Sequence, residues 1–504
     1  MAKSQVCKKC DVEKPIKSFE KLRRGKLRGV CHRCRLGKPS LEKAPRFTRA
    51  LEGQRFLITS AQNNTAVHPG FFASLKVAAK HLGAELVVIP LRYKNPTSQW
   101  ESTQKLWWAS DVVPYLFNTR KKLNPNLVLV GDVKTQPTAS SPLTGFESLT
   151  GAESCIIGHP KMQFRTVPVP SGRFPKILTT TGACTVRNYS DTKAGKIGDF
   201  HHYLGALMVE VQGKKFHLRQ VNADRKDGSF TDLDKVFTSA GVSEAPPALG
   251  LAMGDTHVRV TDPEVDRATF GPGGIVETLS PKTLVFHDIL DGDTVNPHDC
   301  DDPFLGEARR KAGLTEVEAE IKQVVDFVNV RAPGRDVVIV DSNHHAFLAR
   351  WMARTDWRKD LKNAQFYLRT ALATLASAVM TPRGPEYQDP FPVSMRALGL
   401  ATNVRCLGPD ESFKLGDVEC GLHGHRGPNG ARGTLKNLSR LGEKSITGHS
   451  HTPGIEEGGY AVGTSTPRRL HYAHGPSSWL NTHCVVYASG KRSLISIIDG
   501  DWRL

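Results

Sequence analysis

Five short segments rich in metal-ligand residues follow apolar, strand-like runs in the second half of this 504-residue chain. In chain order they are Asp255-Thr256-His257, Asp288 to Asp291, Asn343-His344-His345, His423-Gly424-His425 and His449-Ser450-His451. Carboxylate oxygens, amide oxygens and imidazole nitrogens can bind the same divalent ion, and one carboxylate can bridge two ions. Any single segment is weak evidence, but the ordered set predicts a metal site.

The apolar runs before these segments predict buried strands over residues 249–254, 283–287, 336–340, 418–422 and 444–448. In open α/β folds, reacting groups collect at the carboxyl ends of strands. We therefore expect the five strand ends to converge, although they are spread along the sequence. The alternative interpretation is five independent polar clusters, each satisfied locally.

A second set of ligands lies near the N-terminus, where two C-x2-C pairs are separated by 20 residues. Its members are Cys7, Cys10, Cys31 and Cys34. This spacing allows four thiolates to hold one zinc ion, and such a site keeps no open position for water or substrate. Few apolar residues lie between the pairs, so zinc should fold the segment. His32 could replace a cysteine, but four cysteines are the simpler set.

The charge of the chain is concentrated in the same region. The whole sequence carries +18, and residues 1–50 contribute +12 of it, with 16 Lys or Arg against 4 Asp or Glu. Such a block favours binding to nucleic acid through phosphate contacts, although a solvated tail has the same composition. No long apolar segment or apolar signal core is present, so the sequence disfavours membrane insertion and secretion.

We expect an α/β protein with three parts and one linker. They are a zinc module over residues 1–36, a linker over 37–52, an α/β domain of unknown role over 53–245 and a catalytic domain over 246–504. In the second part, strand-like runs at 55–60, 85–90, 126–131, 176–181 and 206–211 accompany a predicted helix at 70–82. No glycine-rich phosphate loop follows its first strand, and its histidines are scattered.

The ordered motifs at 255–451 resemble those of the calcineurin-like metallophosphoesterase superfamily, over about residues 247–504. The resemblance implies a two-sheet α/β sandwich. It also implies that Asp255, His257 and His451 hold one metal ion and that Asn343, His423 and His449 hold the other. Asp288 would bridge the two ions. His344 matches the family's catalytic histidine, which lies outside the metal shell and protonates or stabilises the leaving oxygen.

The chain departs from the family pattern at three points. His287 stands where the family usually has glycine, and His345 stands where it has the acid that orients the catalytic histidine. Asp291 or Asp341 could orient His344 instead, or that role could be absent. His425 is an alternative to His423 as a ligand, but the first imidazole after the strand is the usual one.

The resemblance implies phosphoester hydrolysis by two divalent ions. Manganese is the first expectation, and magnesium, iron, zinc or nickel are possible. DNA is the expected substrate because of the basic N-terminal segment and the basic residues between the last two motifs. The C-terminal segments resemble proteins of T5-like bacteriophages, one family of which degrades host DNA; these segments are residues 475–479, 481–484, 490–492 and 498–502. The N-terminal segment resembles the zinc-ribbon modules found beside phage nucleases. A host-cytoplasmic DNase, alone or as a homo-oligomer, is therefore expected. The alternatives are a phosphatase or nucleotide phosphodiesterase, and a DNA-binding scaffold with a degenerate site.

Overall fold

The computed structural model describes residues 4–8, 12–19, 21, 26–31, 46–91, 108–133, 135–299, 301–382 and 384–504. The chain divides into two compact units, Met1–Thr48 and Arg49–Leu504. Each unit is built around its own buried residues.

The first unit contains a small antiparallel pair of strands, β1 (Ser4–Val6) and β2 (Glu13–Pro15), followed by one 3-10 turn. Its buried cluster consists of Cys7, Phe19 and Cys31. The backbone N–H of Cys31 donates to Sγ of Cys7 over 3.3 Å. Two of the predicted zinc ligands are therefore adjacent, whereas Cys10, Cys34 and the alternative His32 lie outside the described residues.

The second unit begins with a four-stranded sheet of order β11-β10-β3-β4. The strands are β3 (Arg55–Gln62), β4 (Glu85–Leu91), β10 (Gly205–Gln212) and β11 (Lys215–Asn222). Helix α2 (Pro69–Leu82) connects β3 to its parallel neighbour β4. The side chain of His68 caps the first turn of α2, and Gly83 ends the helix at a left-handed φ of 61°. The predicted βαβ unit is confirmed.

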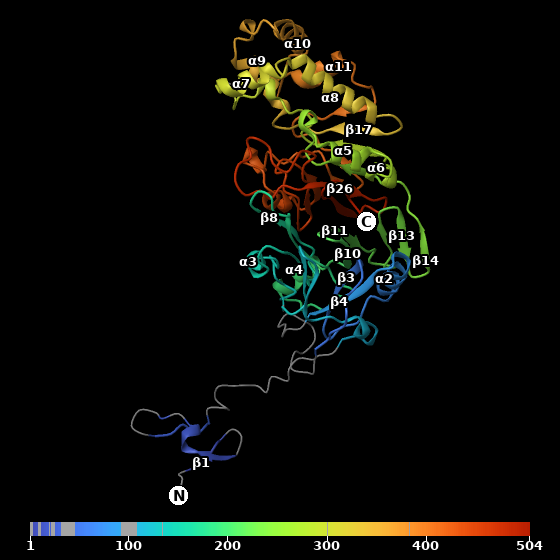
Figure 1. Ribbon diagram of the computed structural model, residues 1–504, viewed down its shortest axis with the longest axis vertical. Coiled ribbons are helices and arrows are strands. Elements are labelled where there is room, and N and C mark those ends of the chain that lie inside the picture. The colour runs from blue at the N-terminus through green and yellow to red at the C-terminus, as the bar shows by residue number, and fades with distance from the viewer. Residues whose placement is uncertain are drawn as a thin grey trace. The chain divides into compact units, whose positions relative to one another are not determined.

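A six-stranded sheet of order β20-β17-β16-β15-β26-β27 belongs to the second half. Its strands are β15 (Gly250–Ala252), β16 (Thr283–Phe286), β17 (Asp336–Ile339), β20 (Val404–Cys406), β26 (Asn481–Val486) and β27 (Arg492–Ile497). Figure 1 shows several helices gathered beside β17. They are α7 (Pro303–Lys311), α8 (Val317–Arg331), α9 (His345–Arg354), α10 (Ala364–Ala376) and α11 (Pro390–Ala397).

A ten-stranded sheet runs through both halves, in the order β21-β22-β23-β25-β24-β8-β9-β7-β6-β5. The first half supplies β5 (Arg120–Asn124), β6 (Leu127–Val130), β7 (Ser154–Ile157), β8 (Phe164–Val167) and β9 (Lys176–Thr180). The second half supplies β21 (Lys414–Leu415), β22 (Val418–Glu419), β23 (Lys444–Thr447), β24 (Gly454–Glu456) and β25 (Gly459–Ala461).

The smaller elements lie around these three sheets. The remaining helices are α3 (Phe146–Leu149), α4 (Lys193–Phe200), α5 (Pro263–Phe270), α6 (Ile275–Leu279) and α12 (Leu435–Leu438). The remaining strands are β12 (Phe230–Asp232), β13 (Lys235–Thr238), β14 (Gly241–Glu244), β18 (Val379–Thr381) and β19 (Gly384–Glu386).

The two halves of this unit repeat one strand arrangement. The order β4-β3-β10-β11 recurs as β16-β15-β26-β27, and in both sets the first pair is parallel and the other two are antiparallel. Likewise β5-β6-β7-β9-β8 recurs as β21-β22-β23-β25-β24, again with matching directions. The halves meet where β8 pairs antiparallel with its counterpart β24. The described part of the chain therefore contains the same two-sheet arrangement twice.

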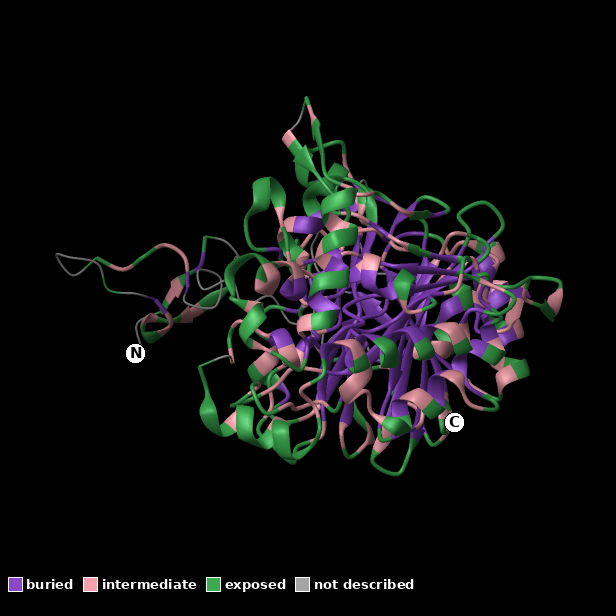
Figure 2. Ribbon diagram, turned by 90° about the horizontal axis from the view of Figure 1, so that it is seen from above, coloured by how far each residue is buried: buried purple, intermediate pink, exposed green. Residues whose placement is uncertain are grey.

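A core shared by both halves lies between the ten-stranded sheet and the other two large sheets. One buried cluster includes residues from both halves, such as Ile58, Ile156, Val285 and Ile446. Figure 2 shows these buried residues concentrated in the interior, with exposed residues on the outer helices and loops. Residues 53–245 and 246–504, predicted as separate domains, thus share a sheet and a core inside one compact unit.

Candidate metal centre

The five predicted motifs all follow strands of the second half. Strands β15, β16 and β17 are parallel neighbours, so their carboxyl ends lie at one edge of the six-stranded sheet. Strands β22 and β23 are parallel neighbours in the ten-stranded sheet. The loops after these strands bring their histidines and carboxylates from the two sheets to one buried place. The predicted convergence of strand ends is confirmed.

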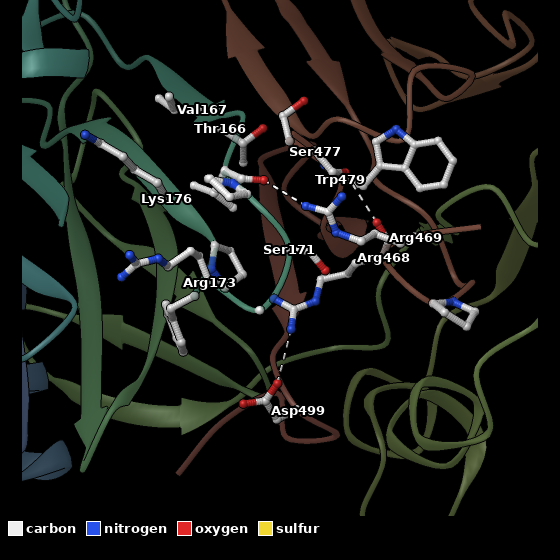
Figure 3. Close-up of a pocket in the computed structure, with 17 residues that line it drawn as sticks. Thr166, Val167, Ser171, Arg173, Lys176, Arg468, Arg469, Ser477, Trp479 and Asp499 are labelled. Carbon is white, nitrogen blue, oxygen red and sulfur yellow. Dashed lines mark hydrogen bonds and ion pairs between the residues drawn. The ribbon is translucent and has the colours of Figure 1, made fainter. Parts of the chain in front are cut away.

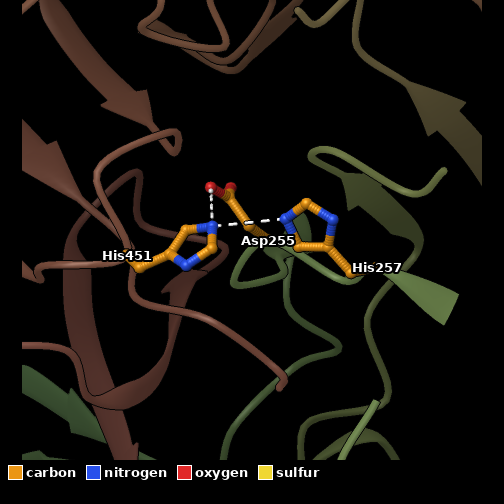
Figure 4. A group of neighbouring side chains, drawn as sticks. All are labelled: Asp255, His257 and His451. Atoms are coloured by element: carbon orange, nitrogen blue, oxygen red, sulfur yellow. Dashed lines mark hydrogen bonds and ion pairs between the residues drawn. The ribbon is translucent and has the colours of Figure 1, made fainter. Parts of the chain in front are cut away.

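The first group of neighbouring side chains is Asp255, His257 and His451 (Figure 4). Nε2 of His451 lies 3.2 Å from Oδ2 of Asp255 and 3.2 Å from Nε2 of His257. Two imidazole nitrogens that face each other beside a carboxylate are arranged to bind one cation. This triad is the one that the family resemblance assigns to the first ion.

Asp288 lies at the centre of the wider cluster. Its Oδ2 is 3.4 Å from Nε2 of His423, 3.8 Å from Nε2 of His257 and 3.9 Å from Nε2 of His344. Its Oδ1 accepts a 2.5 Å hydrogen bond from the hydroxyl of Ser342, which fixes the carboxylate in place. A carboxylate between histidines of both predicted sets is suited to bridge two ions.

Several buried ligand atoms of the cluster make no hydrogen bond within the described structure. They are both carboxylate oxygens of Asp255, both ring nitrogens of His423, Nδ1 of His451 and Oδ1 of Asn343. Buried polar atoms are normally satisfied, because each unpaired one costs about 1–3 kcal/mol. A divalent ion would satisfy such atoms, and the mixture of oxygen and imidazole donors fits one. The residues present therefore fit the predicted metal centre.

Four of the candidate ligands have a left-handed backbone, which non-glycine residues rarely adopt. The φ angles are 43° at His257, 43° at Asp288, 71° at His449 and 54° at His451. Each such conformation costs roughly 1–3 kcal/mol, and residues of this kind cluster at functional sites. The loops after β15, β16 and β23 thus bend sharply to direct these side chains inward.

Gly448 allows the loop after β23 to approach Asp255. A Cβ atom on Gly448 would lie 2.1 Å from Oδ1 of Asp255 and 3.1 Å from Cβ of His287. No side chain fits there without displacing the carboxylate. The glycine before His449 is therefore required by packing at the metal centre.

Mutual electrostatic effects favour the charged forms of His257 and Asp288. Burial lowers the pKa of His257, but the carboxylates of Asp291, Asp288 and Asp255 outweigh it and raise the pKa to about 9. Burial raises the pKa of Asp288, but the neighbouring His344, His423 and His257 hold it well below its usual value. Histidines and carboxylates without a metal ion therefore stabilise one another's charges.

His344 is held by the backbone and not by a carboxylate. Its Nδ1 lies 2.6 Å from the carbonyl oxygen of Asp291, whose carboxylate instead lies 3.3 Å from Nδ1 of His257. Asp341, the other proposed orienting acid, pairs with Arg426 at 3.4 Å. Neither carboxylate therefore orients His344, and the carbonyl of Asp291 takes that position. His345 is buried and accepts a hydrogen bond from the backbone N–H of Ile289.

The structure places His423, and not His425, next to the carboxylates. The ligand atoms of His423, Asp255 and Asp288 lie within 4.8 Å of one another. The rings of His425 and His449 lie farther out, with centroids 5.4 Å and 5.3 Å from the ring of His423. This geometry favours His423 as the inner ligand, and it leaves the assignments of Asn343 and His449 as predictions.

Two neighbours of the centre, Trp479 and His287, have no role in the predicted ligand set. The ring of Trp479 contacts the ring of His451, with centroids 4.2 Å apart. His287 is fully buried beside His423, and burial lowers its pKa to about 4. No local motif marks Trp479, because it reaches the centre from the loop before β26.

The equivalent place among the described residues of the first half does not carry this ligand set. Strand β7 is followed by Gly158-His159-Pro160-Lys161, as its counterpart β23 is followed by Gly448-His449-Ser450-His451. His159 bonds to the carbonyl of Gln136 at 2.8 Å, and Nζ of Lys161 lies 3.2 Å from Glu456. Among the described residues of this half, no group of three close metal ligands occurs.

Comparisons with known proteins identify one relative. No family model and no solved structure matches the chain. Within the described residues, no helix is both long and apolar enough to cross a membrane. The sequence is 34% identical to Protein A1 of Escherichia phage T5 over 469 residues, which cover 89% of this chain and 83% of that protein. The predicted relation to T5-like phage proteins is thus confirmed, and the chain belongs to the bacteriophage family of Protein A1.

Proposed function

We propose that the chain is a dinuclear-metal-dependent phosphodiester hydrolase of the calcineurin-like metallophosphoesterase type, and that it cuts DNA. The observation that carries the proposal is the buried position of Asp288 between His257, His344 and His423. A purely structural cluster would satisfy its buried polar atoms with hydrogen bonds, whereas several here make none within the described structure.

The proposed roles combine the family resemblance with the grouping of Asp255, His257, Asp288, His423 and His451 in the structure. Asp255, His257 and His451 would hold one ion, and Asn343, His423 and His449 the other, with Asp288 shared between them. When bound, two divalent ions lower the pKa of water and neutralise charge on phosphate oxygens. Manganese remains the first expectation for their identity.

His344 is the proposed proton donor to the leaving oxygen. Its Nδ1–H donates to the carbonyl of Asp291, so Nε2 is the atom directed toward Asp288 and the reacting phosphate. A backbone carbonyl fixes the ring orientation without adding a negative charge. The exchange of the proton therefore takes place at Nε2.

Basic residues between the fourth and fifth motifs support DNA as the substrate. Arg432, Lys436 and Arg440 lie between the fourth and fifth motifs, are exposed, and make no ion pair within the described structure. They are available to bind phosphates. The net charge of +12 in residues 1–50, where Cys7, Cys10, Cys31 and Cys34 would hold a structural zinc, also favours a polyanionic substrate. Since the relative is a phage protein, we place the activity in the cytoplasm of an infected bacterium.

Digestion assays test the proposal. Plasmid and linear DNA should be degraded with added Mn²⁺ and should stay intact with EDTA. p-Nitrophenyl phosphate, tested in parallel, reports a monoesterase. Efficient cleavage of that substrate with intact DNA would contradict the DNase assignment and favour a phosphatase.

A further inference from the structure

A cavity of about 490 Å³ lies between the two halves of the second unit. One wall is the loop between β8 and β9 of the first half, and the other comes from residues 467–469 and 477–479 of the second half. Figure 3 shows Arg173, Arg468, Arg469 and Trp479 around this cavity. The first half thus contributes directly to a surface next to the metal centre.

The cavity is positively charged. Its basic lining residues are Arg173, Lys176, Arg468 and Arg469, and Asp499 is the acidic one. The ammonium of Lys176 is engaged away from the cavity by the carbonyls of Glu147 and Gly151.

The three arginines have different partners. Arg469 donates to the carbonyls of Val169, at 2.8 Å, and Gly475, so it ties the two walls together. Arg468 lies 3.4 Å from Asp499. The exposed side chain of Arg173 has no hydrogen bond or ion pair within the described structure. Arg173 is therefore available to an anion, and Arg468 is only partly neutralised.

One residue of the cavity also touches the metal centre. The ring of Trp479 packs against His451, and the backbone N–H of the next residue, Leu480, donates to the carbonyl of His451 over 3.2 Å. The ring of Tyr472, which is 48% exposed, lies 6.1 Å from that of Trp479. The partly exposed ring of Trp479 thus lines the basic cavity and contacts a candidate ligand, and the exposed ring of Tyr472 lies beside it.

We propose that this cavity binds the sugar-phosphate backbone of an unpaired nucleic-acid strand, with a base stacked on Trp479, beside the metal centre. The proposal rests on the proposed phosphodiesterase function and adds a preference for single strands to it. Arginines that contact phosphates and aromatic rings that stack on bases are the features by which proteins bind single strands. Stacking needs an unpaired base, because bases in a duplex expose only their edges.

Binding experiments with the full chain test this. The probes are a fluorescent dT20 strand and a labelled 20-base-pair duplex, titrated at several salt concentrations in EDTA so that no cleavage occurs. Trp479→Ala should weaken dT20 binding about 5- to 100-fold and duplex binding much less, since one stacked base contributes ~1–3 kcal/mol. Arg173→Ala should weaken dT20 binding. It should also reduce the slope of the logarithm of the binding constant against the logarithm of the salt concentration by the amount expected for about one phosphate contact.

Lys196→Ala is the matched control, because it removes one exposed positive charge from helix α4, away from the cavity. It should bind both probes like the wild type. Wild-type-like binding of dT20 by both cavity variants would overturn the proposal, as would equal losses on dT20 and duplex with Trp479→Ala. Hydrolysis of bis(p-nitrophenyl) phosphate by the wild type is measured separately. Its absence would argue against the proposed hydrolase, whereas its presence with unaffected DNA binding would reject only the cavity.

Discussion

Lys161 occupies the strand-end position in the first half that His451 occupies in the second. Each is the fourth residue after equivalent strands, β7 and β23, in the sequences Gly-His-Pro-Lys and Gly-His-Ser-His. Nζ of Lys161 lies 3.2 Å from Glu456 and donates to the carbonyl of Ser140 over 2.6 Å. An ammonium group repels metal ions, so Lys161 is not a metal ligand. Its ion pair with Glu456 links the two halves instead.

Gly448→Ala should disrupt the metal centre. The added methyl group would meet Oδ1 of Asp255 at 2.1 Å, so the carboxylate must move. We expect a large loss of metal content, measured by elemental analysis, and of DNA cleavage. Gly306→Ala is the control, because its Cβ meets nothing within 4 Å inside helix α7. It should keep both metal and activity and raise the free energy of unfolding by up to ~1 kcal/mol.

Asp288→Ala should abolish metal-dependent hydrolysis more completely than His425→Ala does. Removing a shared carboxylate disturbs both ions, so we expect a loss beyond the 10- to 100-fold that supporting residues typically give. Cleavage rate and bound metal are measured on both variants. Equal losses of activity and metal in the His425 variant would move the ligand assignment from His423 to His425.

Local sequence patterns were sufficient to predict the five strands that end at the candidate ligands, and their polar ends. Apolar runs marked β15, β16, β17, β22 and β23, and parallel pairing then explains why their ends converge. The repeat of the two halves was not predicted. The repeat is a pattern of strand pairing, which is a long-range property that local sequence patterns do not reveal. The residues at equivalent positions also differ, as Lys161 and His451 illustrate.

The directions of side chains in the loops could also not be predicted from the sequence. Asp291 was a candidate to orient His344, but the left-handed backbone at Asp288 turns the following loop. The carboxylate of Asp291 then meets His257, and only its carbonyl reaches His344. Trp479 reaches the centre, and the β8–β9 loop reaches the neighbouring cavity, from distant segments of the chain, so no spacing rule could locate them.

The zinc prediction is tested by elemental analysis of the purified chain. About one zinc per chain should survive mild chelation that removes the ions of the catalytic pair, because four thiolates bind zinc tightly. Cys7→Ser combined with Cys34→Ser should remove it. Unchanged zinc in that double variant would show that the four-thiolate assignment is wrong.

The buried pair of Glu210 and Arg219 predicts a pH-dependent contribution to stability. Burial raises the pKa of Glu210, but Arg219, 2.6 Å away, outweighs this effect and lowers it. Because the pKa of Glu210 is lower in the folded state, its carboxylate stabilises the fold at pH values above the unfolded-state pKa near 4.3. This stabilisation is lost as the pH falls through the lower, folded-state pKa. Glu210→Gln should cost about 1.5–3 kcal/mol at pH 7 in urea unfolding. The difference from wild type should shrink below pH 4, and a constant difference would contradict this origin.

His344→Asn should separate chemistry from binding. The side chain faces Asp288 at 3.9 Å but is held by the carbonyl of Asp291, so its loss should leave both ions and DNA affinity in place. Proton donors of this kind contribute ~10²- to 10⁴-fold in rate, and single-turnover cleavage should fall by that order. Metal content and DNA binding are measured on the same preparation.

His298→Asn is the matched control for that variant. His298 is exposed, and its ring packs against the same Phe347 that contacts His344, with centroids 6.0 Å and 4.6 Å from Phe347, respectively. It belongs to none of the ligand groups formed by the described residues, so its replacement should leave cleavage unchanged. Full activity in His344→Asn would remove His344 from the mechanism. Loss of a metal ion in that variant would instead show that His344 is a ligand. His344 would then replace Asn343 in the proposed ligand set.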